Sequence, residues 1–94
     1  MRSSRRYSQP VTKNDITRGQ VRVPIGPTKS LLPNARARIN VVLHGQPLCC
    51  RWDPRYGSKQ RSGVIGIGKQ AGSLLTPGDL LDIALGENGA VLLT

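Results

Sequence analysis

The chain has 94 residues, which is enough for one small domain and too few for two. Leucine, isoleucine and valine make up about a quarter of it, so we expect a packed core. There is no phenylalanine and only one tryptophan, and branched aliphatic side chains favour a pleated sheet over a helix bundle. No run approaches ~18 apolar residues and no hydrophobic signal segment is present, so we expect neither a membrane span nor secretion.

The charge is large and unevenly distributed. Fourteen lysines and arginines face five acidic residues, which gives a net charge of +9. All fourteen basic residues lie within residues 1–69, whereas residues 70–94 carry three acidic residues and no basic one. Ten of the fourteen are arginines, which form forked hydrogen bonds with phosphates and with guanine edges. This pattern predicts a polyanionic partner, nucleic acid above all; a generic basic protein of the ribosomal or membrane-surface kind is the alternative.

The N-terminal part divides into an arm and a first group of elements. Residues 1–9 are polar, basic and without periodicity, which predicts a flexible arm ahead of a domain over residues 10–94. Val11–Lys13 is expected to form a short strand. Residues 20–25 alternate between apolar and polar, which predicts a half-buried strand that ends near its proline. One helical turn is expected over residues 28–32.

The remainder reads as short strands joined by turns. Residues 39–52 predict a hairpin around His44-Gly45-Gln46-Pro47, and residues 64–67 a further strand. A turn with a helical fragment is expected over residues 68–75, and a closing hairpin over residues 80–93. The fold class expected is therefore mainly β. We predict an open pseudobarrel of about seven strands with one or two short helices, because a sheet that curls toward closure exposes less of its edges.

Neither a catalytic site nor a metal site is predicted. The neighbours Cys49 and Cys50 point to opposite faces of an extended strand, so they are not expected to form a disulfide. Together with His44 they fall short of the four ligands of a structural zinc site. The segment Gly66-Ile67-Gly68-Lys69 lacks the spacing of a phosphate-binding loop. We expect no catalytic residues, no metal and no cofactor.

Two basic loops next to strands are the stronger candidate site. Arginine and glutamine are the side chains that recognise guanine and adenine edges, while lysine and serine commonly hold phosphates. The lone tryptophan is as compatible with packing at the base of the second loop as with contact to a base. The first loop carries Arg18, Gly19, Gln20 and Arg22. The second loop, with the strand end that leads into it, carries Arg51, Trp52, Arg55, Tyr56, Gly57, Ser58, Lys59, Gln60 and Arg61.

Three stretches, in this order, resemble the B3-like DNA-binding pseudobarrel domains. VTKNDITRGQVRVP resembles their opening, RWDPRYGSKQRSGVIGIGK their long loop between two central strands, and LLTPGDLLDIAL the turn before their closing hairpin. The resemblance runs from about Pro10 to the C-terminus. It is closer to the target-recognition domains of restriction endonucleases such as EcoRII, BfiI and NgoAVII than to the plant transcription factors. The plant domains have aromatic-rich central strands and a Gly-Trp step, where this chain has Ile67-Gly68-Lys69.

The resemblance implies a function. In this family two loops grip the major groove like the jaws of a wrench, which implies an N-terminal jaw at residues 18–20 and 22 and a C-terminal jaw at residues 55–61. The chain is then a sequence-specific binder of double-stranded DNA without catalysis of its own. It would serve as the recognition module of a cytoplasmic bacterial restriction-modification or other defence protein, whose catalytic domain or subunit lies elsewhere. An AbrB-like transcriptional regulator or antitoxin is the alternative, and that class predicts an obligate dimer. An RNA-binding barrel is less compatible with an aromatic content of 3%.

Overall fold

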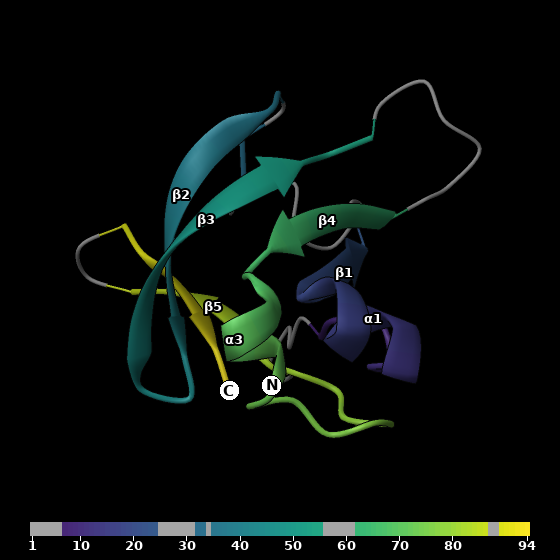
Figure 1. The fold of residues 1–94 in the computed structure, drawn as a ribbon. Helices are drawn as coiled ribbons and strands as arrows, with labels where there is room; N and C mark the ends of the chain where they lie inside the picture. The colour runs from purple at the N-terminus through teal and green to yellow at the C-terminus, as the bar shows by residue number, and fades with distance from the viewer. Residues whose placement is uncertain (1–6, 25–31, 34, 56–61, 87–88) are drawn as a thin grey trace, which may run out of the picture.

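A single curled sheet dominates the computed structural model of the chain (Figure 1). The structure describes residues 7–24, 32–33, 35–55, 62–86 and 89–94. Within these ranges six strands lie in the order β1-β4-β3-β2-β6-β5, and all neighbours are antiparallel except β2 and β6. A mainly β fold with short helices is therefore confirmed. The strands are Gln20–Pro24 (β1), Ala37–Leu43 (β2), Gln46–Asp53 (β3), Ser62–Gly66 (β4), Ile83–Leu85 (β5) and Val91–Leu93 (β6), and the helices are Lys13–Arg18 (α1) and Lys69–Gly72 (α3).

The predicted central hairpin is confirmed as β2 and β3. Its turn consists of His44 and Gly45, both with positive φ, at 48° and 84°. Two residues with positive φ twist the chain in the direction that matches paired strands. The register then runs from Leu43 opposite Gln46 to Ala37 opposite Trp52, so both strands are longer than predicted. The predicted closing hairpin is also present, as β5 and β6.

Alternation along the strands separates a buried face of the sheet from an exposed one. In β1 the two valines are buried while the residues beside them are partly exposed. In β4 Gly63 and Ile65 are buried in the same alternating way. Most of the buried hydrophobic side chains in the described chain are branched aliphatics, as the composition predicted, and Cys50, Trp52 and Ala71 complete the set. The best buried side chains are Leu43, Ile65, Leu81, Leu93, Val21, Val23, Val41 and Cys50.

The strand expected over Val11–Lys13 is wrong, because α1 begins there. Thr12 caps this helix: its hydroxyl accepts a hydrogen bond from the Asp15 backbone N–H, and the Asp15 carboxylate accepts one from the Thr12 N–H. This reciprocal capping box satisfies backbone donors that a short helix would otherwise leave free. The replaced strand explains why the described residues contain six strands and not about seven. No described helix has the length and apolar character needed to cross a membrane.

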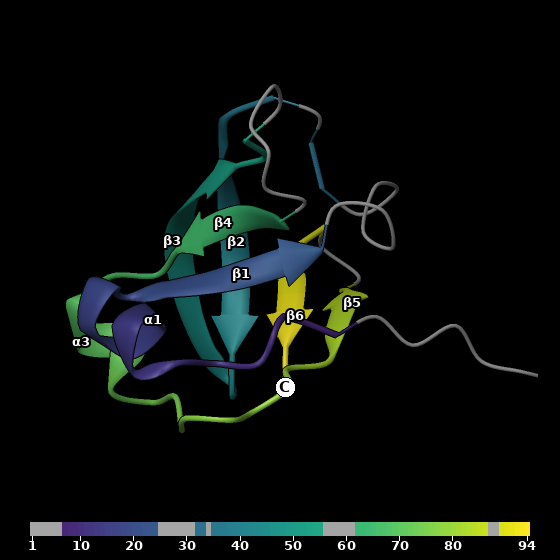
Figure 2. The ribbon, with the colours of Figure 1, turned by 90° about the vertical axis from the view of Figure 1, so that its right-hand side faces the viewer.

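Helices α1 and α3 lie side by side at one end of the sheet (Figure 2). Their backbones approach so closely that a Cβ atom at Gly72 of α3 would lie 2.6 Å from the Ile16 carbonyl oxygen of α1. The predicted helical fragment after β4 is thus confirmed as α3. The helical turn expected over residues 28–32 lies mostly outside the described residues, so it stays a prediction.

The ordered fold starts earlier than the predicted boundary at Pro10. Ser8 is buried, its N–H donates to the Leu81 carbonyl at 2.8 Å, and its hydroxyl accepts from the Leu81 N–H at 3.0 Å. The Gln9 N–H donates to the Arg22 carbonyl at 2.8 Å. The last residues of the predicted arm therefore belong to the fold. Residues 1–6 lie outside the described ranges.

Candidate nucleic-acid interface

The polar face of four adjacent strands carries the candidate site. We call the outward-facing side of β1, β4, β3 and β2 the outer face. Strand register places Gln20 opposite Gly66, Gly66 opposite Arg51, and Arg51 opposite Arg38. With neighbouring strands about 4.8 Å apart, this row spans roughly 14 Å of sheet. The inward neighbours in the sequence, such as Val21, are buried.

The buried carboxylate of Asp15 binds two side chains of the first predicted loop. Asp15 is 2% exposed, and its carboxylate accepts hydrogen bonds from Gln20 Nε2 at 3.0 Å and from Arg22 Nε at 3.0 and 3.1 Å. Arg22 Nη2 also donates to the Pro10 carbonyl at 2.9 Å. Burial of the carboxyl opposes its ionisation, but the hydrogen bonds from Gln20, Thr12 and Arg22 outweigh it and hold the pKa of Asp15 below its ordinary value of 3.8. We call Thr12, Asp15, Gln20 and Arg22 the Asp15 cluster.

Two predicted site residues therefore have internal partners. Gln20 and Arg22 lie on the outer face, as expected, yet both donate to Asp15. Gln20 still has its carbonyl oxygen, and Arg22 its second terminal amino group, to offer a ligand. The sequence did not predict this arrangement, although the Thr-x-x-Asp spacing of a capping box was visible in it.

Gly19 has a backbone role between α1 and β1. It ends α1 in the left-handed conformation, with φ 67°, and its N–H donates to the Ile16 carbonyl. A Cβ atom here would overlap the carbonyl group of Gly68 and lie 2.6 Å from the Lys69 nitrogen. The Gly19 carbonyl in turn accepts the N–H groups of Ile67 and Gly68. Gly19 is therefore buried, and its backbone ties the first loop to the chain that leads into α3.

The second predicted loop begins at a strained residue. Arg55 has a positive φ of 56°, which is uncommon outside glycine. The Asp53 carboxylate accepts the Arg55 N–H at 2.9 Å and also lies 3.5 Å from Arg36 Nε. Asp53 thus fixes the direction in which the chain leaves β3. Six residues predicted for this loop lie outside the described ranges: Tyr56, Gly57, Ser58, Lys59, Gln60 and Arg61.

A pocket joins the starts of the two predicted loops. It has a volume of about 350 Å³ and is lined by residues of α1 and β1 together with Arg55. Three of its lining residues are arginines, against a single aspartate that is already hydrogen-bonded. We call it the loop pocket. Its lining residues are Thr12, Asn14, Asp15, Arg18, Gln20, Arg22 and Arg55.

The last two predicted site residues lie on opposite sides of β3. Trp52 is 3% exposed, and its indole N–H donates to the Pro33 carbonyl at 2.7 Å. Its ring lies against Gly63, where a Cβ atom would overlap it. Trp52 therefore packs at the base of the second loop and is not part of the exposed outer face. Arg51 is exposed on the outer face.

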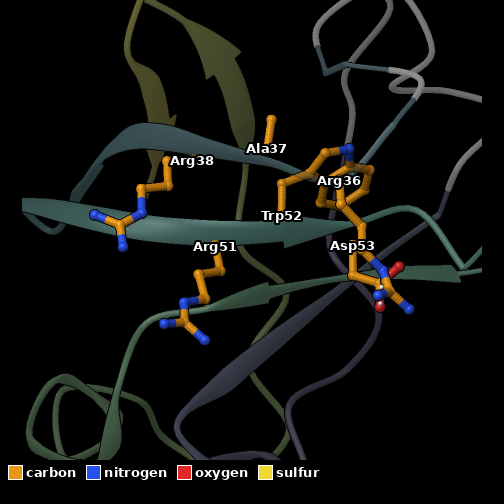
Figure 3. A pocket seen from close by; sticks show the side chains of 6 residues that line it. All are labelled: Arg36, Ala37, Arg38, Arg51, Trp52 and Asp53. Carbon is orange, nitrogen blue, oxygen red and sulfur yellow. Dashed lines mark ion pairs between the residues drawn. The ribbon is translucent and has the colours of Figure 1, made fainter.

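Sequence reasoning missed two arginines at the start of β2. Arg36 and Arg38 are exposed and, with Arg51 and Asp53, line a pocket of about 570 Å³ (Figure 3). The signal was the alternation Arg36-Ala37-Arg38-Ile39, which has the period of a half-buried strand. The pattern that predicts the hairpin begins only at Ile39, so Arg36 and Arg38 lie outside the predicted strand.

Within the described ranges no three His, Cys, Asp or Glu residues are grouped as metal ligands would be. Cys49 and Cys50 are both free thiols, one exposed and one buried, as expected from their adjacent positions in a strand. Burial raises the pKa of Cys50 to about 11, with a smaller contribution from Cys49, which makes Cys50 a poor nucleophile.

A scan against protein-family models matched none, and a search of the curated proteins returned no match.

Proposed function

We propose that this domain binds double-stranded DNA with sequence specificity, through its two basic loops in the major groove. The observation that carries the proposal is the loop pocket, which brings Arg18 and Arg22 together with Arg55 from a segment more than thirty residues away. Arginines gathered at one pocket suit the binding of phosphates and guanine edges. The role as target-recognition module of a bacterial restriction or defence protein rests on the B3-like resemblance and is part of the same proposal.

The pattern of strand pairing supports a self-contained module. All six described strands find their partners within one chain, and so do the core side chains. An AbrB-like regulator would instead complete its sheet with a second copy. A sizing measurement of the purified chain separates the two: we expect a monomer near 10.2 kDa, and an obligate dimer would favour the regulator.

The salt dependence of binding tests the proposal. We expect the affinity for duplex DNA to fall linearly on a log–log plot against salt concentration, with a slope of roughly −3 to −6, because each neutralised phosphate contributes about −0.9. Duplex DNA should outcompete single-stranded DNA and RNA of the same sequence. A flat salt response, or equal competition by single strands, would contradict the proposal.

A matched pair of variants locates the interface. Arg18→Ala removes one positive charge from the loop pocket. Leu85→Glu changes the net charge by the same amount on β5, the strand farthest from β1 in the sheet order, where Leu85 is exposed. We expect the first variant to lose roughly tenfold or more in affinity for a preferred duplex, as a lost arginine–guanine contact would. The second should lose far less, and equal losses would indicate only a long-range charge effect.

A further inference from the structure

We propose that Arg38 and Arg51 together bind a backbone phosphate of the DNA, beside the bases that the two loops contact. The inference rests on the proposed function and extends it to a surface that the loops do not include. We call these two residues the arginine pair.

The arginine pair is a direct cross-strand pair of like charges. Arg38 of β2 is the register partner of Arg51 of β3. A two-residue turn makes Leu43 and Gln46 a hydrogen-bonded pair, so alternation makes Arg38 and Arg51 a non-hydrogen-bonded pair, with Cα atoms only ~4.5 Å apart. Like charges opposite each other destabilise a sheet. An anion between the two guanidinium groups would convert this repulsion into two attractions.

The described part of the chain offers the arginine pair no partner. Neither side chain has an ion pair or hydrogen bond there. Asp53, which lines the larger pocket with both arginines, is engaged by Arg36 at 3.5 Å and by the Arg55 N–H at 2.9 Å. Figure 3 shows both arginine side chains running in the same direction, away from the ion pair of Arg36 and Asp53.

A space of suitable size lies beside the two side chains. Arg38, Arg51 and the exposed Cys49 line a pocket of about 280 Å³, and Arg38 and Arg51 also line the larger pocket next to it. Two arginine forks can bind one phosphate from two sides, and such contacts are sequence-independent. Among the described residues, no acidic side chain lines this smaller pocket, so none would repel a phosphate there.

The spacing agrees with duplex DNA. Arg51 and Arg38 lie two and three strands from Gln20, or roughly 10 and 14 Å along the sheet. The major groove is about 12 Å wide, so a protein reading bases near Gln20 reaches a phosphate strand at this distance. Between them lies Gly66, which has no side chain to hold the DNA away.

The test compares the double variant Arg38→Ala/Arg51→Ala with Leu85→Glu and the unchanged chain. Binding is measured on a duplex selected by the unchanged chain, across a range of salt concentrations. We expect the double variant to lose roughly 3- to 10-fold in affinity for every duplex, to keep the same preferred sequence, and to have a salt slope less negative by about 0.9, one phosphate contact. Replacing single phosphates by uncharged methylphosphonates should reveal one position that weakens the unchanged chain but not the double variant.

Cys49 provides a second readout that needs no substitution. A maleimide should alkylate exposed Cys49, while buried Cys50 serves as an internal control that does not react. Bound duplex should slow the alkylation of Cys49 at least severalfold. The inference is overturned if specific, salt-dependent binding is intact while the double variant keeps its affinity and slope and Cys49 stays fully reactive. If the unchanged chain binds no duplex, the proposed function fails, and the inference fails with it.

Discussion

Asp15 and Arg22 form a short, half-shielded ion pair, with Arg22 Nε 3.0 Å from the Asp15 carboxylate. The carboxylate is almost fully buried while the Arg22 side chain keeps 31% of its surface exposed. The pair joins the cap of α1 to the outer face of β1, and Gln20 completes it. Through this contact, the stability of α1 and the position of the Arg22 and Gln20 side chains depend on the same carboxylate.

Removing the charge of Asp15 should lower both the stability of the domain and its affinity for DNA. We expect Asp15→Asn to lower the free energy of unfolding by about 2–3 kcal/mol, below the range of roughly 3–5 kcal/mol for fully buried pairs because Arg22 is partly solvated. Urea unfolding measures this loss. Asp82→Asn is the control, because it removes one negative charge from a half-buried position that has no ion pair among the described residues, and it should change stability by less than about 0.5 kcal/mol. A similar loss in both variants would contradict the role given to Asp15.

Because of the same carboxylate, the free energy of unfolding should fall as the pH is lowered below about 4. The pKa of Asp15 is lower in the folded chain than its ordinary value of 3.8, so below that value the unfolded chain takes up protons first. The contribution of Asp15 is therefore fully present above about pH 4 and is lost as the pH falls through the folded pKa. Unfolding free energies of the unchanged chain and Asp15→Asn, measured from about pH 6 to pH 2, should converge at the acid end. A difference that stays constant over this range would exclude Asp15 as its cause.

Gly19 should be far less replaceable than Gly45, although both have positive φ. The left-handed conformation costs an alanine about 1–2 kcal/mol at either position. A Cβ atom at Gly45 meets nothing within 4 Å, whereas at Gly19 it overlaps the Gly68 backbone. We expect Gly45→Ala to show only the conformational cost and Gly19→Ala to lose at least about 2 kcal/mol more, together with DNA affinity. Equal losses in thermal unfolding would mean that α1 and α3 separate easily.

Gly66 tests whether the outer face contacts DNA. A Cβ atom there lies 3.8 Å from the Arg51 carbonyl oxygen, which is ordinary contact, so larger residues are tolerated sterically. We expect Gly66→Ala to bind DNA nearly as the unchanged chain does. Gly66→Glu should fold but lose more than tenfold in affinity, because its side chain stands in the row between Gln20 and Arg51 and repels phosphate. Full binding by the glutamate variant would place the DNA elsewhere.

The sequence predicted those elements whose pattern lies within one short stretch of the chain, and it did not predict pairings between distant stretches. The hairpin of β2 and β3 was predictable because alternation and a glycine turn lie within one stretch. The helix α1 was misassigned because apolar Val11 next to Thr12 suggested a strand, while its capping box involves only polar residues. The parallel pairing of β2 with β6 joins segments some fifty residues apart, and no local pattern specifies it.

The candidate site was predictable in its residues but not in their partners. Charge and loop position identified Arg18, Gln20, Arg22 and Arg55, which the structure brings to one pocket. That Asp15 engages Gln20 and Arg22 depends on how α1 folds back beside β1, which composition does not reveal. Arg38 was missed because its role depends on strand register opposite Arg51.

Selection of bound duplexes from a random library is the most direct test of sequence-specific recognition by the two loops. The full chain should enrich one short motif, because the loop pocket brings three arginine side chains together and arginine is the side chain that best recognises guanine edges. Repeating the selection with Arg18→Ala and with Arg55→Ala should relax the preference at one or two base pairs each, a discrimination of about 1–3 kcal/mol per lost contact. Retention of the full motif by both variants, or the absence of any enriched motif with the unchanged chain, would contradict DNA recognition through these loops.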